Sequence, residues 1–228
     1  MNRSVPNPIY NITPFTLLDY PDKTACIIWF AGCNMKCPYC YNPEIVLGKG
    51  KMSFSDSLTF IEKRRNLLDG VVLSGGECTM HHGIEQYAAQ IKGMKMLVKI
   101  DTNGSHPEKL KGLIQGNLVD YVALDFKSLS AGFDRITKSN LFDQFVESLE
   151  LLIVSGIPFE VRTTVHSDLL SLIDIQQMAG FLTEKKYKGN YYIQNFVGDT
   201  PTLDDMHYSV PLRSGNFAEG DVNIIIRN

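Results

Sequence analysis

The sequence predicts an α/β fold built on a parallel β-sheet. Short apolar runs rich in β-branched residues alternate along the chain with segments of helical periodicity. Most runs are too uniformly apolar for a sheet with one face in water, so we expect helices on both faces. Six strands alternating with five helices form a repeated βα unit with right-handed crossovers, short of the eight units of a closed barrel. An open partial barrel and a doubly wound sheet both fit this pattern.

The elements follow one another in a regular order. Strands are predicted at residues 24–31, 70–74, 96–101, 120–125, 159–165 and 191–196. Helices are predicted at 54–68, 84–91, 107–116, 142–153 and 172–182, where apolar residues recur every three or four positions. Ser53 and Asp56 form a near capping box before the first helix, and Pro107 suits the first turn of the third, which Gly116 ends.

One domain is expected over residues 1–197, with residues 1–23 as an N-terminal extension. Residues 198–228 differ in character, because turn-forming residues dominate before a short apolar run at 222–226. We interpret them as an irregular tail that packs a last strand on the same domain.

Composition excludes several classes of protein. A formal net charge of −3 provides no general attraction to nucleic acid or to anionic membranes. No apolar run approaches the ~20 residues of a membrane span, and residues 1–10 lack the apolar core of a secretory signal. Five cysteines, three of them clustered, do not pair evenly into disulfides. We therefore expect a cytoplasmic protein.

The most informative motif is the cluster of Cys33, Cys37 and Cys40, with the spacing C-x3-C-x2-C. Three thiolates this close can hold a metal. A structural zinc or an electron-transfer cluster is normally completed by four protein ligands, so three leave one coordination position for something else. A zinc site completed by His81 or His82 is the alternative.

Polar residues follow each predicted strand, at the edge where parallel βα folds bind ligands. These residues are Gly75-Gly76-Glu77, Asp101-Thr102-Asn103, Asp125 and Lys127, Arg162 with His166, and Gln194-Asn195. Most of these groups also have a simpler explanation. Gly75-Gly76 suits a tight turn, Asp101 to Asn103 suit strand-end turns, Lys127 and Arg162 suit a structural ion pair, and His166 suits a loop. Cys26 and Cys78 are most simply packing residues.

Together these motifs resemble the radical S-adenosylmethionine (SAM) superfamily. The segments FTLLDYPDKTACIIWFAGCNMKCPYCYNPE, LLDGVVLSGGECT, LVKIDTNGS, VDYVALDFKS and FEVRTTV resemble those of the activating proteins of anaerobic ribonucleoside-triphosphate reductase. The resemblance covers roughly residues 10–197 and is shared more loosely with the activating enzyme of pyruvate formate-lyase. It departs at Tyr41 and Cys78, where relatives commonly have histidine and proline. It implies a partial (β/α)6 barrel, open on one side.

The resemblance also implies cofactors and the residues that bind them. Cys33, Cys37 and Cys40 would each bind one iron of a [4Fe–4S] cluster, and SAM would chelate the fourth iron. Tyr39 would lie by the adenine, and Gly75, Gly76 and Glu77 would hold the methionine amino group. Asp101, Thr102, Asn103, Asp125, Lys127 and His166 match positions that contact the methionine carboxylate or the ribose.

By the same resemblance, cleavage of SAM yields a radical that takes hydrogen from a glycine of a partner enzyme. The large subunit of an anaerobic ribonucleotide reductase is the expected partner, and a flavodoxin or ferredoxin the expected electron donor. Two alternatives remain open. One is a radical SAM enzyme acting on a small molecule, similar to the deazaguanine-forming synthases, and the other is an activase of a different glycyl radical enzyme. Neither nucleic acid nor membrane is an expected partner.

Overall fold

The computed structural model describes residues 7–213 and 222–227. Its eight strands form an open sheet in which the strand order is the order of the chain, from β1 to β8. This open α/β arrangement confirms the predicted fold class. The chain divides into two compact units, each described by itself below. In the described part, the first unit contains residues 7–34, 44–102 and 108–122, and the second contains the others.

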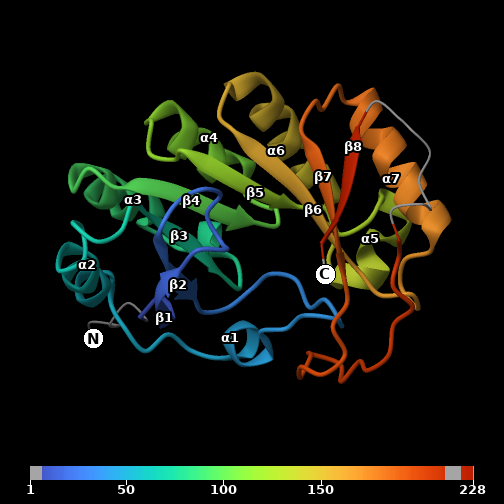
Figure 1. Cartoon of the computed structure of the whole chain (residues 1–228), viewed down its shortest axis with the longest axis horizontal. Helices are drawn as coiled ribbons and strands as arrows, with labels where there is room; N and C mark the ends of the chain where they lie inside the picture. Colours follow the sequence, from blue (N-terminus) through green and yellow to red (C-terminus); the bar gives the residue numbers. More distant parts are fainter. Residues whose placement is uncertain (1–6, 214–221, 228) are drawn as a thin grey trace. The chain divides into compact units, whose positions relative to one another are not determined.

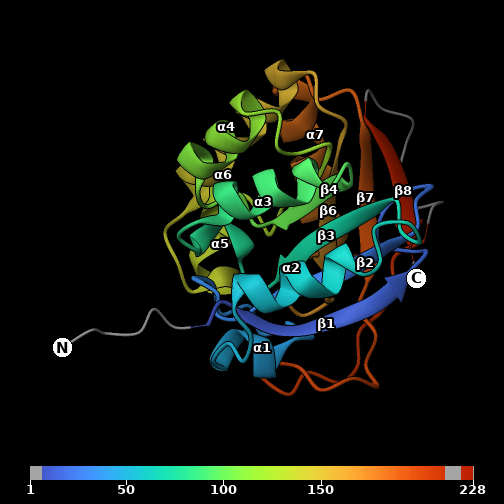
Figure 2. The same ribbon diagram turned by 90° about the vertical axis from the view of Figure 1, so that its left-hand side faces the viewer.

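The strands of the first unit run in both directions. β2 (Ala25–Phe30), β3 (Gly70–Gly75) and β4 (Leu97–Thr102) are parallel, in a register that places Phe30 opposite Gly75. β1 (Ile9–Thr16) pairs with β2 in the antiparallel direction, as Figure 2 shows. An apolar cluster of Tyr20, Ala25, Ile27 and Val72 lies beneath Trp29, Leu97 and Tyr121. Burial of these side chains anchors the strands that lead to the polar edge.

The first unit contains α-helices and one 3₁₀ helix. They are α1 (Pro43–Leu47, whose first residue falls in the second unit), α2 (Phe54–Glu62), the 3₁₀ helix η1 (Cys78–Met80), α3 (Ile84–Gly93) and α4 (Pro107–Gln115, whose first residue falls in the second unit). Ser53 and Asp56 form the full capping box of α2. The predicted helix to residue 68 is too long, because α2 ends at Glu62 and a series of turns leads to the buried Leu68.

The second unit contains the three parallel strands β6 (Phe159–Val165), β7 (Asn190–Asn195) and β8 (Asn223–Arg227), which Figure 1 shows side by side. β5 (Tyr121–Asp125) ends in this unit. Its helices are α5 (Ser130–Thr137), α6 (Phe142–Ser155) and α7 (Leu172–Glu184). Phe126 stacks on Phe145 at a centroid distance of 4.7 Å inside this unit. Aromatic packing of this kind stabilises the chain at the end of β5, which Phe126 follows directly.

The predicted strands are confirmed within one residue at each end, and β8 is the predicted last strand of the tail. The sequence pattern did not predict β1, α1, α5 or η1. β1 alternates buried and exposed residues irregularly and includes Pro14, so it lacks the uniform apolar run of the other strands. α5 begins at Ser130, and its N-cap residue Leu129 provides no side-chain hydrogen bond to the first turn. In the described part of the chain, no helix combines the length and apolarity that a membrane crossing requires.

Candidate active site

Two glycines in the first unit allow very close approach between the ends of β2 and β3. The backbone N–H groups of Gly76 and Glu77 donate to the carbonyls of Phe30 and Gly32, both at 2.9 Å. A Cβ added to Gly76 would lie 1.7 Å from the Gly32 carbonyl oxygen. Gly75 has φ +122°, and its Cβ would lie 2.4 Å from the Phe30 nitrogen. Only glycine fits at these two positions. The Gly-Gly-Glu segment is thereby fixed directly against the residue that precedes Cys33.

Glu77 is buried and held by three donors. Its Oε1 accepts hydrogen bonds from the Thr79 N–H at 3.1 Å, from Thr79 Oγ1 at 2.6 Å and from Thr102 Oγ1 at 2.8 Å. Thr79 comes from η1 and Thr102 from the end of β4, so the contact joins two of the predicted segments. The carboxylate is fixed in orientation before any ligand binds, which is what an ammonium-binding group requires.

Asp101 takes part in a buried ion pair that sequence reasoning missed. Lys99 Nζ lies 2.5 Å from Asp101 Oδ1, and the Ser74 hydroxyl donates to Asp101 Oδ2 at 3.1 Å. The Lys99 side chain is only 2% exposed. The signal was present in the sequence, because a lysine two residues before Asp101 in an apolar strand must share its face of the sheet. Cys78 donates to the Asp101 carbonyl at 3.5 Å and is fully buried, and its burial raises the pKa of the thiol.

Cys37 and Cys40 lie in a tight turn of the second unit. The Cys40 N–H donates to the Cys37 carbonyl at 3.0 Å, and Cys37 and Tyr39 are buried. Burial raises the pKa of the Cys37 thiol above its usual value; the charge of Lys127 opposes the shift, and the neighbouring Cys40 adds to it. The Tyr39 hydroxyl is buried without a hydrogen-bond partner among the described residues. This orphaned group is a place where a polar ligand would be favourable.

Asp125, Lys127 and Arg162 form an ion-pair cluster in the second unit. Asp125 Oδ1 lies 3.0 Å from both Arg162 Nε and Nη2, and Asp125 Oδ2 lies 3.2 Å from Lys127 Nζ. Burial alone would raise the pKa of Asp125, but the charges of Arg162 and Lys127 outweigh it and hold that pKa below its usual range. The structural ion pair considered from the sequence is therefore present. It keeps a cation within electrostatic reach of Cys37.

Asn103 and His166 each use one polar atom locally. Asn103 Oδ1 accepts from the Ser105 N–H at 3.0 Å, the turn expected from composition. His166 Nδ1 accepts from the Asp168 N–H at 3.2 Å, and the ring meets Phe196 edge-on at 4.7 Å. His166 Nε2 is buried without a partner among the described residues. With Nδ1 as acceptor, Nε2 holds the proton of the neutral ring and can donate it to a ligand.

The structure thus groups the predicted residues in two sets. Gly75, Gly76, Glu77, Asp101 and Thr102 lie together in the first unit, with Gly32 joining them to Cys33. Cys37, Tyr39, Cys40, Asp125 and Lys127 belong to the second unit, as do Asn103 and His166. Among the described residues, no three His, Cys, Asp or Glu side chains are arranged to hold a single metal ion.

The donor set fits an iron–sulfur cluster. The three clustered cysteines are free of disulfide bonds. In a cubane cluster each thiolate binds a different iron, so the sulfur atoms need not converge on one point as they do around a single ion. The unpartnered Tyr39 hydroxyl and His166 Nε2 add polar groups that an organic ligand could use.

The family model and the similar proteins of known name agree with one another. The model of the radical SAM superfamily matches residues 27–179. A Methanocaldococcus jannaschii protein, provisionally named as a glycyl-radical enzyme activating enzyme, is 32% identical over 75% of this chain and 73% of its own length. The pyruvate formate-lyase 2-activating enzyme of Escherichia coli is 26% identical over 65% of this chain and 63% of its own. Fe-coproporphyrin III synthase of Methanosarcina barkeri is 26% identical over 76% of this chain and 45% of its own.

Solved structures show the same fold. Streptococcus suis SuiB bound to S-adenosylmethionine aligns with a TM-score of 0.67 at 14% identity, covering 86% of this chain and 48% of SuiB. QueE from Escherichia coli aligns with a TM-score of 0.56 at 17% identity, covering 83% and 84% of the two chains. The chain therefore spans about half of SuiB and most of QueE.

Proposed function

Because the chain belongs to the radical SAM superfamily, we propose that it activates a glycyl radical enzyme, with anaerobic ribonucleoside-triphosphate reductase as the partner. The cofactors of the superfamily are a [4Fe–4S] cluster and S-adenosylmethionine, and a structural neighbour contains the latter. The match to the Methanocaldococcus jannaschii protein is the observation that carries the proposal, because it extends over about three quarters of both chains. The E. coli activating enzyme supports the same class at lower identity.

When bound, the cluster and S-adenosylmethionine supply a 5′-deoxyadenosyl radical that takes a hydrogen atom from a glycine. The chain's own residues hold and orient these groups. Cys33, Cys37 and Cys40 are the cluster ligands in this proposal. Glu77 binds the methionine ammonium group, supported by the three donors that fix its Oε1.

The remaining residues have orienting roles in the proposal. Gly75 and Gly76 bring backbone close to the cofactor, and Tyr39 lies by its adenine. The methionine carboxylate and ribose are contacted by Asp101, Thr102, Asn103, Asp125, Lys127 and His166. Lys127 is a suitable carboxylate partner because, although burial would lower its pKa, the charge of Asp125 opposes that effect and the pKa is raised, so the ammonium group keeps its charge. His166 is suitable because its buried Nε2 has a proton to donate.

The test is the formation of a protein radical. The reconstituted, reduced protein is mixed with S-adenosylmethionine and the anaerobic reductase, and the glycyl radical doublet is measured by electron paramagnetic resonance. A flavodoxin or ferredoxin should replace the chemical reductant. A variant with alanine at Cys33, Cys37 and Cys40 is the matched control and should give neither 5′-deoxyadenosine nor the doublet. Accumulation of 5′-deoxyadenosine without the doublet would refute the reductase as partner.

A small-molecule substrate is the second candidate. The similarity to Fe-coproporphyrin III synthase favours it, since that name describes a small-molecule product. Charged side chains on β6 and β8 would be candidates to bind such a substrate. However, Glu160 pairs with Arg227 at 3.2 Å, and Arg162 pairs with Asp125 at 3.0 Å. These charges already neutralise one another, so we favour the protein substrate.

A further inference from the structure

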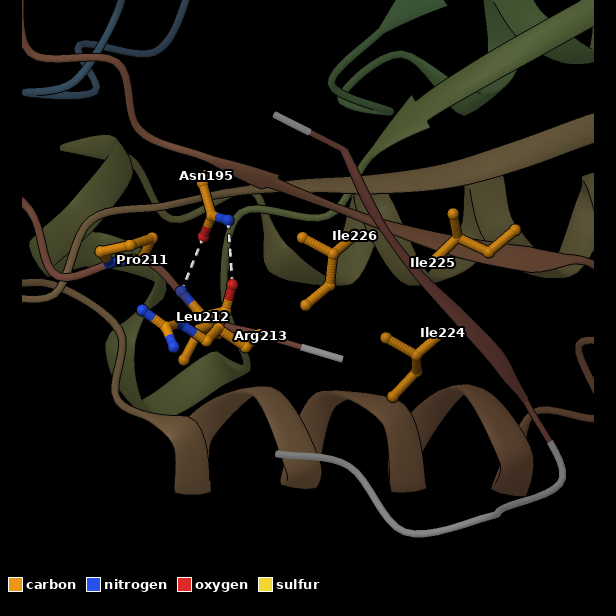
Figure 3. Close-up of a pocket in the computed structure, with 7 residues that line it drawn as sticks. All are labelled: Asn195, Pro211, Leu212, Arg213, Ile224, Ile225 and Ile226. Atoms are coloured by element: carbon orange, nitrogen blue, oxygen red, sulfur yellow. Dashed lines mark hydrogen bonds between the residues drawn. The ribbon is translucent and has the colours of Figure 1, made fainter. Parts of the chain in front are cut away.

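The segment that follows β7 returns to the residue where it began. We call residues 197–212 the strap. The Leu212 N–H donates to Asn195 Oδ1 at 2.8 Å, and Asn195 Nδ2 donates to the Leu212 carbonyl at 3.0 Å, as Figure 3 shows. Ser167 reinforces this end, since its N–H donates to Ser209 Oγ at 3.0 Å and its Oγ accepts from the Val210 N–H at 3.2 Å. The strap is therefore a closed loop with fixed ends.

The middle of the strap is an ordered turn. The Asp205 N–H donates to the Thr202 carbonyl at 3.3 Å, and Thr202 Oγ1 accepts from the Met206 N–H at 2.8 Å. Asp205 has φ +52°, a left-handed conformation that Asp tolerates better than most residues. Leu203 and Asp204 occupy the two central positions of this turn, so their N–H groups point outward from it.

Those two N–H groups bind the backbone of the cysteine turn. The Leu203 N–H donates to the Cys40 carbonyl and the Asp204 N–H to the Pro38 carbonyl, both at 3.1 Å. At the start of the strap, the Val197 N–H donates to the Tyr41 hydroxyl at 2.7 Å. The Tyr41 ring stacks on Phe196 at a centroid distance of 5.5 Å. The strap thus contacts the cysteine turn at three of the residues 38–41, namely Pro38, Cys40 and Tyr41.

The cysteine turn has little regular structure to hold it. Residues 31–42 contain no helix or strand. In the second unit, its backbone is also held by the hydrogen bond from the Cys40 N–H to the Cys37 carbonyl and by one from the Lys36 N–H to the Thr137 carbonyl at 2.8 Å. The strap therefore satisfies carbonyls that no helix or sheet would satisfy, and unsatisfied carbonyls would favour another turn conformation.

We propose that the strap is a positioning element which holds Cys37 and Cys40 in the conformation needed to bind iron, before the cluster is present. The idea rests on the proposed ligation of the cluster by these cysteines. It assigns a function to the strap: the hydrogen bonds donated by Leu203, Asp204 and Val197 hold the cysteine turn in the conformation in which Cys37 and Cys40 bind the cluster. A looser strap opens the cysteine turn more often in the metal-free protein, and it releases iron faster from the loaded one.

Leu203 offers a matched pair of variants. Leu203→Pro deletes the N–H that binds the Cys40 carbonyl, and proline is favoured at this position of a turn, so the turn itself should persist. Leu203→Ala removes the side chain and keeps the N–H. Tyr41→Phe provides an independent variant, because it deletes the acceptor of the Val197 N–H and keeps the ring that stacks on Phe196.

The readout is alkylation of individual cysteines in metal-free, reduced protein. Iodoacetamide is added in a short pulse, and the labelled peptides are quantified by mass spectrometry. Loss of one neutral hydrogen bond corresponds to about a two- to tenfold increase in local opening. We expect Cys37 to be labelled faster by that factor in Leu203→Pro and in Tyr41→Phe, and at the wild-type rate in Leu203→Ala. Cys26 and Cys78, buried in the first unit, report on global unfolding and should not change.

Iron release to a chelator from the reconstituted protein should follow the same order. If Leu203→Pro also accelerates labelling of Cys26 and Cys78, the substitution has destabilised the whole fold and is not informative about the strap. The comparison of Tyr41→Phe with the wild type then tests the proposal. Equal Cys37 labelling in Tyr41→Phe and wild type would then overturn the proposal. Equal labelling in Leu203→Pro and Leu203→Ala would overturn it directly. Because labelling requires no partner enzyme, failure to find a glycyl radical would refute the proposed function and leave this result standing.

Discussion

Replacing Lys99 by methionine removes a buried cation and leaves the packing nearly unchanged. The two side chains have similar length, so the main loss is the ion pair with Asp101, whose atoms lie 2.5 Å apart. The Lys99 and Asp101 side chains are 2% and 13% exposed, which leaves water little access to the carboxylate once its partner is gone. The variant therefore measures how much the ion pair between Lys99 and Asp101 contributes to the free energy of unfolding.

The expected cost follows from this burial. Breaking a buried pair by removing one partner typically costs about 3–5 kcal/mol, because the other charge stays buried and unpaired. The Ser74 hydroxyl still donates to Asp101 at 3.1 Å, which offsets roughly 1 kcal/mol. We expect Lys99→Met to lower the free energy of unfolding by about 2–4 kcal/mol, measured by urea denaturation of the metal-free, reduced protein.

A surface pair provides the matched control. Lys185 Nζ lies 2.6 Å from Glu150 Oε1, nearly the same distance, but these side chains are 30% and 55% exposed. Lys185→Met should cost about 0–1 kcal/mol. If Lys99→Met costs no more than Lys185→Met, the Asp101 carboxylate is reached by water and the argument from burial is wrong. A double-mutant cycle with Asp101→Asn then measures the coupling directly.

Four further predictions concern single substitutions. Gly76→Ala should destabilise the metal-free protein in denaturant unfolding by more than about 2 kcal/mol, since its Cβ would lie 1.7 Å from the Gly32 carbonyl oxygen. Gly180→Ala, with no atom near its Cβ inside α7, should be stabilising by roughly 0.5–1 kcal/mol. Asp125 has a lowered pKa, so its stabilisation is present above the usual carboxyl value of about 3.9 and is lost as pH falls through the folded value. Asp125→Asn should therefore flatten the acid side of the stability profile measured by denaturant midpoints between about pH 2 and pH 6; an unchanged acid side would contradict it. Glu77→Gln keeps an oxygen that can accept from Thr79 and Thr102 and removes the charge, so binding of S-adenosylmethionine to the reconstituted protein should weaken at least about tenfold with little loss of stability; unchanged affinity in calorimetry would exclude Glu77 as the ammonium ligand.

The helices and strands that the sequence predicted correctly are those with a single local cause, either burial of a whole strand or capping of a helix by nearby residues. β3 and β4 are almost entirely buried, so their apolar runs stand out in the sequence. The capping box of α2 is local, and Ser53 with Asp56 is sufficient to locate its start. β1 could not be found in this way, because its stability comes from antiparallel pairing with β2 rather than from its own composition.

The strap shows the same limit for irregular structure. Its turn-forming composition predicted irregular structure before the last strand of the tail, and residues 198–212 contain no helix or strand. Nothing in that composition indicates that the Leu203 and Asp204 N–H groups meet the carbonyls of Cys40 and Pro38. Backbone groups are the same at every residue, so a contact between two main chains leaves no mark in the side-chain pattern.

The polar strand ends lie between these two cases. Parallel pairing predicts that residues after successive strands meet at one edge, and Ser74 does contact Asp101 there. Which residues face each other depends on the register, and β3 pairs with β4 so that Leu73 lies opposite Ile100. A shift of one residue would turn Lys99 and Asp101 together to the other face of the sheet and would separate Asp101 from Ser74. The register therefore selects the contact between Ser74 and Asp101, and the sequence alone names the candidate residues at the edge without showing which of them meet across strands.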